Sequence, residues 1–404
     1  MRKLSLILLV LLAIYSCSKK NDVTGSGSPE NTSKADTLVT YKFPGDGVSG
    51  FLPNAYLVAT DSSGNIISEV KTQIGTSVYK LYTPKIYSNA RLNVYEIDVP
   101  TDPTAQPIIL GYLQIKKGSI YDTSVGSSTP SNYPLNIHFK NASAFDQLTL
   151  STDLQSNSIT NIADTVQYRN LAYSNNSKIW LQIQKNNKTL YNFFDVTKGT
   201  HDLNIDFNQC NKVPQVRNMT APGSFFSMYV YAKPNKNNIE EYFFGQGFTL
   251  SNTLSYYYPT ETFEQYSTRI SYYLNSARQY TFVNVGATVP TQIDTYNADF
   301  KNTGSSLADY KTTVSGSYDY YMANFIGNNI SNSIYIELYS PSVANYRNYK
   351  LPDFSKYIDK KYLDPTKIVF QNFMLSQVDG FNESKLPYKI ASSHDVNMKT
   401  VEGR

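Results

Sequence analysis

The feature that most constrains the fold of this 404-residue chain is its repeated alternation of short strand-forming runs with turn-forming residues. Runs rich in valine, isoleucine, tyrosine, phenylalanine and threonine are separated by glycine, asparagine, aspartate, serine and proline, as is typical of all-β proteins. The segment 178–184 (KIWLQIQ) alternates strictly, so that its three aliphatic residues share one face and Trp180 lies on the other. The pattern predicts an all-β protein with two or three β-sandwich domains of immunoglobulin-like character.

The expected boundaries follow composition. We expect a β-sandwich domain over 36–140, a second over 141–255, and a tyrosine-rich C-terminal β domain over 256–404. Within the last, residues 262–278 place apolar side chains at helical spacing, and Thr262 with Gln265 has the pattern of a capping box. This segment is predicted to form an amphipathic helix.

Residues 55–84 align without a gap on 179–208, an offset of 124 positions. Each segment contains a strand, a polar turn, a second strand, a Gly-Thr pair and an alternating strand. Two interpretations remain open: two copies of one sandwich unit, or the general resemblance of hairpins in a chain of biased composition.

The N-terminus carries the most specific signal. Residues 1–16 consist of a basic tip and a short apolar run ending at Ile14, as in a secretory signal peptide. The apolar run Leu4–Ile14 would span roughly 16 Å as a helix, too little for a hydrocarbon core of about 30 Å.

The four residues Ile14-Tyr15-Ser16-Cys17 resemble the lipobox of bacterial lipoproteins. The resemblance implies that a diacylglycerol is attached to the sulfur of Cys17 and that the signal is removed before it. Residues 17–35 then read as a lipidated, flexible tether, because they contain no aromatic residue and are rich in small polar ones. Ser18 lacks the aspartate that retains lipoproteins in the inner membrane. We therefore expect a protein anchored by lipid in the outer membrane, either on its periplasmic face or at the cell surface.

Charge and cysteine content exclude several classes. The chain has 36 basic and 32 acidic residues, so its charge does not favour binding to nucleic acid. If Cys17 carries lipid, Cys210 has no partner for a disulfide and is either a buried small hydrophobe or a free thiol.

No catalytic motif is present. The three histidines, His138, His201 and His394, lie outside the nucleophile-elbow and zinc-protease patterns. The segment Asp61–Gly64 reads as a turn rather than a calcium loop. A glycosidase would require two carboxylates at a fixed separation, and candidates are Glu240, Glu241, Asp353 and Asp359. We expect no enzyme activity, no metal and no cofactor.

Tyrosine is unusually abundant, at 35 residues against one tryptophan. Exposed tyrosine rings can stack on sugars and hydrogen-bond their hydroxyls, whereas buried ones fill sheet faces. The candidate binding residues are clustered tyrosines: Tyr256, Tyr257, Tyr258, Tyr272, Tyr273, Tyr318, Tyr320 and Tyr321.

Thr37 and Thr165 follow an aspartate and precede an aliphatic residue, which resembles an O-glycosylation acceptor of exported Gram-negative proteins. The leading functional hypothesis is a non-catalytic envelope lipoprotein that binds or adheres to a glycan or protein. The alternatives are a structural accessory subunit of an outer-membrane assembly and, third, an unrecognised glycoside hydrolase.

Overall fold

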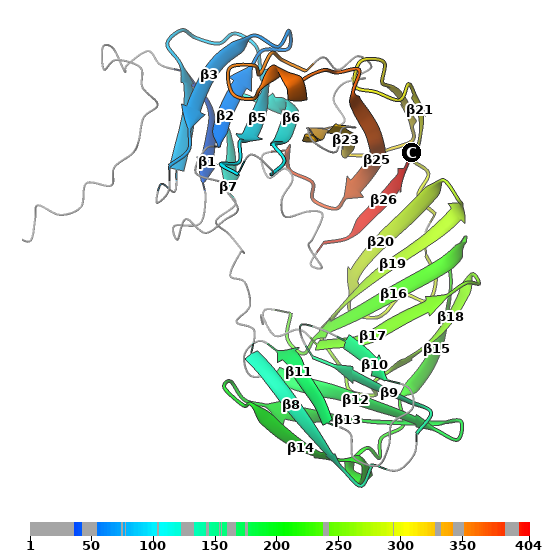
Figure 1. The fold of residues 1–404 in the computed structure, drawn as a ribbon. Helices are drawn as coiled ribbons and strands as arrows, with labels where there is room; N and C mark the ends of the chain where they lie inside the picture. Colours follow the sequence, from blue (N-terminus) through cyan, green and yellow to red (C-terminus); the bar gives the residue numbers. More distant parts are fainter. Residues whose placement is uncertain are drawn as a thin grey trace, which may run out of the picture.

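The structure is a computed structural model, and most of its described residues lie in β-strands (Figure 1). It describes residues 36–42, 55–73, 76, 78–102, 105–122, 133–142, 145–152, 154, 156–159, 167–173, 177–236, 242–293, 295–327, 333–341, 351–383 and 396–404. Cys17, Thr165, Glu240, Glu241 and His394 lie outside these ranges. No helix in the described part of the chain is long and apolar enough to cross a membrane.

The first structural unit is a seven-stranded sandwich. Its sheets have the strand orders β4-β1-β7 and β3-β2-β5-β6, with β7 parallel to β1. The strands are β1 (Asp36–Lys42), β2 (Tyr56–Thr60), β3 (Ile66–Lys71), β4 (Val78–Thr83), β5 (Arg91–Asp98), β6 (Ile108–Lys116) and β7 (Ser119–Asp122).

The second unit repeats this topology strand for strand. Its sheets are β11-β8-β14 and β10-β9-β12-β13, and β14 is again parallel to the first strand. The strands are β8 (Tyr133–Lys140), β9 (Gln147–Ser151), β10 (Ser156–Ile159), β11 (Gln167–Tyr173), β12 (Ser177–Lys185), β13 (Lys188–Val196) and β14 (Asp202–Asp206), followed by the 3-10 helix η2 (Phe207–Gln209).

The third unit keeps the same arrangement with a reduced last strand. Its four-stranded sheet is β17-β16-β19-β20, β15 pairs with β18, and a parallel bridge from Thr220 to Gln292 stands where the seventh strand would pair. The strands are β15 (Gln215–Thr220), β16 (Ser224–Lys233), β17 (Tyr242–Thr249), β18 (Thr253–Tyr258), β19 (Gln265–Asn275) and β20 (Arg278–Gly286).

The fourth unit has a four-stranded sheet, β24-β23-β25-β26, and a separate hairpin, β21-β22. Its elements are β21 (Asp299–Thr303), β22 (Lys311–Ser315), β23 (Tyr320–Gly327), β24 (Tyr335–Pro341), the 3-10 helix η3 (Lys360–Tyr362), β25 (Ile368–Val378) and β26 (Met398–Gly403).

Three of these four-stranded sheets join end to end into one sheet of 12 strands. Strand β20 of unit 3 pairs antiparallel with β26 of unit 4, and β24 of unit 4 pairs parallel with β6 of unit 1. The sheet arches, with unit 1 at one end and unit 2 near the other (Figure 1). The boundary expected at 140 falls inside unit 2, between β8 and β9, and the boundary expected at 255 falls within β18 of unit 3.

The all-β prediction is confirmed, and each of the first two units is a two-sheet sandwich. The order of strands within the sheets differs from that of an immunoglobulin domain. With strands lettered A to G along the chain, these units have sheets D-A-G and C-B-E-F, whereas an immunoglobulin constant domain has A-B-E-D and C-F-G.

The helix predicted over 262–278 is wrong, because the segment contains strand β19. Its neighbours β16 and β20 satisfy the backbone of β19 on both sides. Tyr266, Thr268, Ile270 and Tyr272 alternate toward the core, a spacing of two that the helical reading overlooked. Sheet pairing here overrides a local pattern.

The similarity between residues 55–84 and 179–208 is the general resemblance of hairpins and does not mark two copies of one unit in register. Residues 55–84 contain the second to fourth strands of unit 1, whereas 179–208 contain the fifth to seventh strands of unit 2. The two segments are not structurally equivalent, because the counterpart of β2 is β9 rather than β12. A repeat does exist, but at a different offset.

Aromatic side chains connect units 2 and 3. Trp180 is buried, and its ring lies 4.4 Å from the Tyr191 ring and 5.2 Å from the Phe193 ring. From unit 2, the Tyr191 hydroxyl donates to Glu261 at 2.6 Å in the connection before β19. Strand β12 is therefore buried on both faces, with Ile179 and Leu181 in the core of unit 2.

The fold disfavours the ionised form of Asp98, which lies at the end of β5. Burial raises the pKa of its carboxyl to about 6, and Oδ1 has no hydrogen-bond partner among the described residues. Because the folded protein favours the protonated carboxyl, the contribution of Asp98 to the free energy of unfolding is complete below pH 4 and is lost as the pH rises through 6.

Asp98→Asn should therefore stabilise the protein at pH 7.5. Two pKa units correspond to about 3 kcal/mol, and partial solvent contact reduces the expected gain to about 1–2 kcal/mol. Urea unfolding at pH 7.5 and at pH 4 checks this, and the gain should vanish at pH 4. An equal gain at both pH values would contradict it.

Candidate functional site

The structure buries most of the tyrosines proposed for binding. Tyr256, Tyr258, Tyr272, Tyr320 and Tyr321 are in the core. Burial raises the pKa of both Tyr256 and Tyr272 to about 12. The expectation that these five rings are exposed for a ligand is therefore wrong.

Their positions explain the burial. Tyr256 and Tyr258 alternate toward the core of unit 3, while the intervening Tyr257 is half-buried beside the exposed Val216. Consecutive Tyr320 and Tyr321 are both buried because strand β23 has a hydrophobic core on each face. Tyr318 is half-buried and packs against the core, whereas Tyr273 is half-buried on β19.

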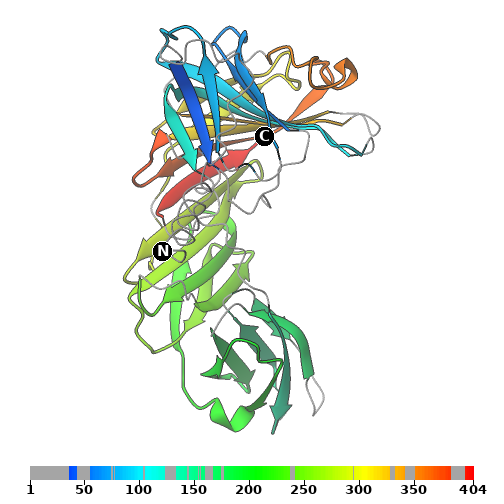
Figure 2. The same cartoon turned by 90° about the vertical axis from the view of Figure 1, so that its left-hand side faces the viewer.

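Tyr273 lies on the face of the sheet β17-β16-β19-β20 that points away from strands β15 and β18. On β16, β19 and β20, alternate residues such as Met228, Ile270 and Phe282 point into the core, so the residues between them point to the opposite side. Ser267 and Val283 on that side are buried, so the open part of the face lies away from them. We call the outward set the concave tyrosine face: Ser227, Tyr229, Tyr231, Arg269, Ser271, Tyr273, Gln279 and Thr281. Figure 2 looks onto this side and shows no other sheet in front of it.

Strand register orders this face into rows. Tyr229 lies opposite Arg269, Ser227 opposite Ser271, and Ser271 opposite Thr281. The hydroxyls of Ser271 and Thr281 are 2.9 Å apart, and Tyr273 donates to the Gln279 amide oxygen at 2.9 Å. The result is a row of small hydroxyl side chains with larger aromatic and polar ones on either side.

Sequence reasoning missed Tyr229, Tyr231 and Arg269 because it selected runs of adjacent tyrosines, whereas Val230 separates Tyr229 from Tyr231 and Arg269 lies on another strand. A signal was available: Tyr229 and Tyr231 alternate with Met228, Val230 and Ala232, which is the pattern of a strand with one tyrosine-bearing face. Their proximity to Arg269 depends on the pairing of β16 with β19.

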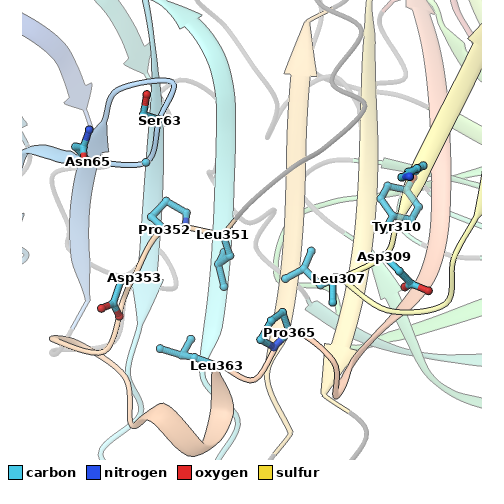
Figure 3. Close-up of a pocket in the computed structure, with 13 residues that line it drawn as sticks. Ser63, Asn65, Leu307, Asp309, Tyr310, Leu351, Pro352, Asp353, Leu363 and Pro365 are labelled. Carbon is cyan, nitrogen blue, oxygen red and sulfur yellow. The ribbon is translucent and has the colours of Figure 1, made fainter.

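A groove of about 690 Å³ lies between units 1 and 4 (Figure 3). Its walls are the β2–β3 turn at Ser63–Asn65 and the β21–β22 loop at 307–311, and the segment 351–365 completes it. The Asp61 carboxylate accepts from the backbone N–H groups of Ser63 and Asn65 at 2.9 Å, which confirms the predicted turn.

The groove contains Asp353, a candidate glycosidase residue, together with Asp309. A hydrogen bond from Ser306 lowers the pKa of Asp309, and one from the Ser355 backbone lowers the pKa of Asp353. A glycosidase needs one carboxyl group that keeps its proton near neutral pH. These two carboxylates stay ionised and serve as acceptors for their own loops.

The other predicted residues have structural environments. His138 on β8 contacts Asp202 on β14 at 3.0 Å, and Asp359 accepts from the Lys361 backbone at 3.0 Å. Thr37 is half-buried in β1, and the adjacent Asp36 pairs with Lys117 at 2.8 Å. Cys210 is buried, which raises the pKa of its thiol to about 12. Within the described ranges, no three potential metal ligands come together.

Comparisons with known proteins give little. No family model matches the chain, and no curated protein matches it. Among solved structures, alpha-2-macroglobulin of Escherichia coli activated by porcine elastase aligns at 10% identity and a TM-score of 0.13, covering 85% of this chain. The chain spans 42% of that structure. A TM-score this low supports no inference about fold or function.

Proposed function

We propose that this chain is a non-catalytic lipoprotein of the cell envelope, anchored through Cys17, that binds a glycan on the concave tyrosine face. The observation that carries the proposal is the combination of half-exposed tyrosine rings with a row of hydroxyl side chains on one open sheet face. Rings can stack on sugar faces while hydroxyl and amide groups hydrogen-bond sugar hydroxyls.

Replacing Tyr229 and Tyr273 together by alanine should weaken glycan binding by about 10- to 100-fold, because each ring contact contributes about 0.5–1.5 kcal/mol. Binding of the purified full chain to a glycan array, followed by titration of the best ligand, measures this. Tyr257→Ala is the matched control, since Tyr257 is half-buried on another sheet. Equal affinities of the double variant and the control would refute the proposal.

A protein ligand is the alternative, and it would also suit an accessory subunit of an outer-membrane assembly. Phe248 is 62% exposed and Leu250 is 65% exposed, at the end of the edge strand β17. Exposed apolar side chains at a sheet edge favour contact with another protein. Crosslinked protein partners without any glycan signal would favour this reading.

The anchor has its own test. Cys17→Ala should release the protein from the membrane fraction and abolish labelling with radioactive palmitate, because stable anchoring needs more than one acyl chain. Cys210→Ala should keep both properties, since that thiol is buried in unit 2. Full membrane partitioning of labelled Cys17→Ala would contradict the anchor.

A further inference from the structure

We infer that the glycan bound on the concave tyrosine face is acidic, bearing carboxylate or sulfate groups that pair with Arg269. This inference rests on the proposed function and specifies its ligand. It begins from the side chain of Arg269, which is exposed in the middle strand of the face.

Arg269 differs from three other arginines of the described chain. Arg91 pairs with Glu383 at 3.1 Å, Arg217 lies 4.4 Å over the Tyr258 ring, and Arg278 bonds Asp299 and the Phe300 carbonyl. Arg269 makes no hydrogen bond or ion pair with any described residue. Its guanidinium therefore offers a complete set of donors to a ligand, in the planar arrangement that matches carboxylate or sulfate oxygens.

The charges near Arg269 favour an anion. Lys233 lies on the same face, four residues beyond Tyr229 on β16. The acidic side chain on the corresponding face of β26, Glu402, accepts from the Asn372 amide at 2.6 Å and lies beside Gln279 at the far edge. The exposed guanidinium of Arg269 places a positive charge beside Tyr229, and this charge attracts acidic ligands.

The rest of the face fits a sugar chain rather than an isolated anion. Tyr229 lies directly opposite Arg269, so a ring stacked on Tyr229 places its substituent beside the guanidinium. The hydroxyls of Ser227, Ser271 and Thr281 form a row across three strands, and neighbouring strands are about 4.8 Å apart. That spacing is comparable to one pyranose residue, so a linear glycan would run across the strands.

Binding of the purified full chain to a uronate polymer, a sulfated dextran and unmodified dextran tests this inference. The acidic polymers should bind at least about tenfold more tightly than dextran, and Arg269→Gln should remove that preference, because a hydrogen bond to a charged group contributes about 1.5–3 kcal/mol. Comparing the two acidic polymers separates carboxylate from sulfate recognition. Lys301→Gln, which removes an equal charge from the exposed side of β21, should leave binding unchanged.

The outcomes separate the two levels of the proposal. Equal binding of acidic and neutral polymers, or an Arg269→Gln variant that keeps the preference, overturns the acidic ligand. If binding still depends on Tyr229 and Tyr273 in that case, the proposed function stands. Failure of every polymer and array glycan to bind overturns both.

Discussion

Val401→Asp is expected to lower the free energy of unfolding by more than about 4 kcal/mol, because it places an unpaired carboxylate in a core. Val401 is fully buried in β26, where it lies opposite Tyr280 of β20 and Leu375 of β25. Strand β26 is the element through which the sheets of units 3 and 4 join. Loss of this strand would expose unpaired backbone groups on both neighbours.

Urea denaturation followed by circular dichroism measures this effect. Val216→Asp is the matched control, because Val216 is 59% exposed on β15 and the same substitution there should change stability by no more than about 0.5 kcal/mol. An unchanged denaturation midpoint for Val401→Asp would show that β26 does not occupy the centre of the sheet.

Trp180→Ala is expected to be nearly as damaging, at about 3–5 kcal/mol, the usual range for deleting a large buried aromatic side chain. Its ring packs on Tyr191 and Phe193, and these two connect unit 2 to Glu261 and Phe263 of unit 3. The substitution should therefore both destabilise the protein and loosen unit 2 from the rest of the molecule.

Denaturation gives the first effect, and limited proteolysis between units 2 and 3 gives the second. Phe248→Ala is a suitable control, since that aromatic residue is 62% exposed and its loss should have little effect on stability. If Trp180→Ala unfolds no earlier than this control, Trp180 does not form a packed junction between the units.

The strands were predictable from sequence because their signal is local. Runs of β-branched and aromatic residues between turn formers correspond to β2, β5 and β6, and the Asp61 turn follows from its side-chain chemistry. The order of strands was not predictable, because it depends on contacts such as β24 with β6, which are more than 200 residues apart. The incorrect helix at 262–278 and the incorrect repeat offset have the same origin, because strand pairing between distant segments cannot be read from local sequence.

The candidate site shows that limit most clearly. Clustering in sequence selected Tyr256–Tyr258 and Tyr320–Tyr321, but adjacent residues of a strand point to opposite faces, and here most of those faces are buried. Tyr229 and Arg269 lie side by side only because β16 and β19 pair in one register. If β16 were shifted by one residue against β19, its apolar side chains would point outward and its tyrosines would point into the core.

The central claim is that ligand binds on the concave tyrosine face, and hydrogen–deuterium exchange of the purified full chain with and without its best glycan tests it most directly. Ligand should slow exchange in peptides covering 227–233, 267–273 and 279–285, which belong to β16, β19 and β20. Peptides lining the groove, at 305–311 and 351–365, should be unaffected. Protection confined to the groove, with none on the three strands, would contradict the account.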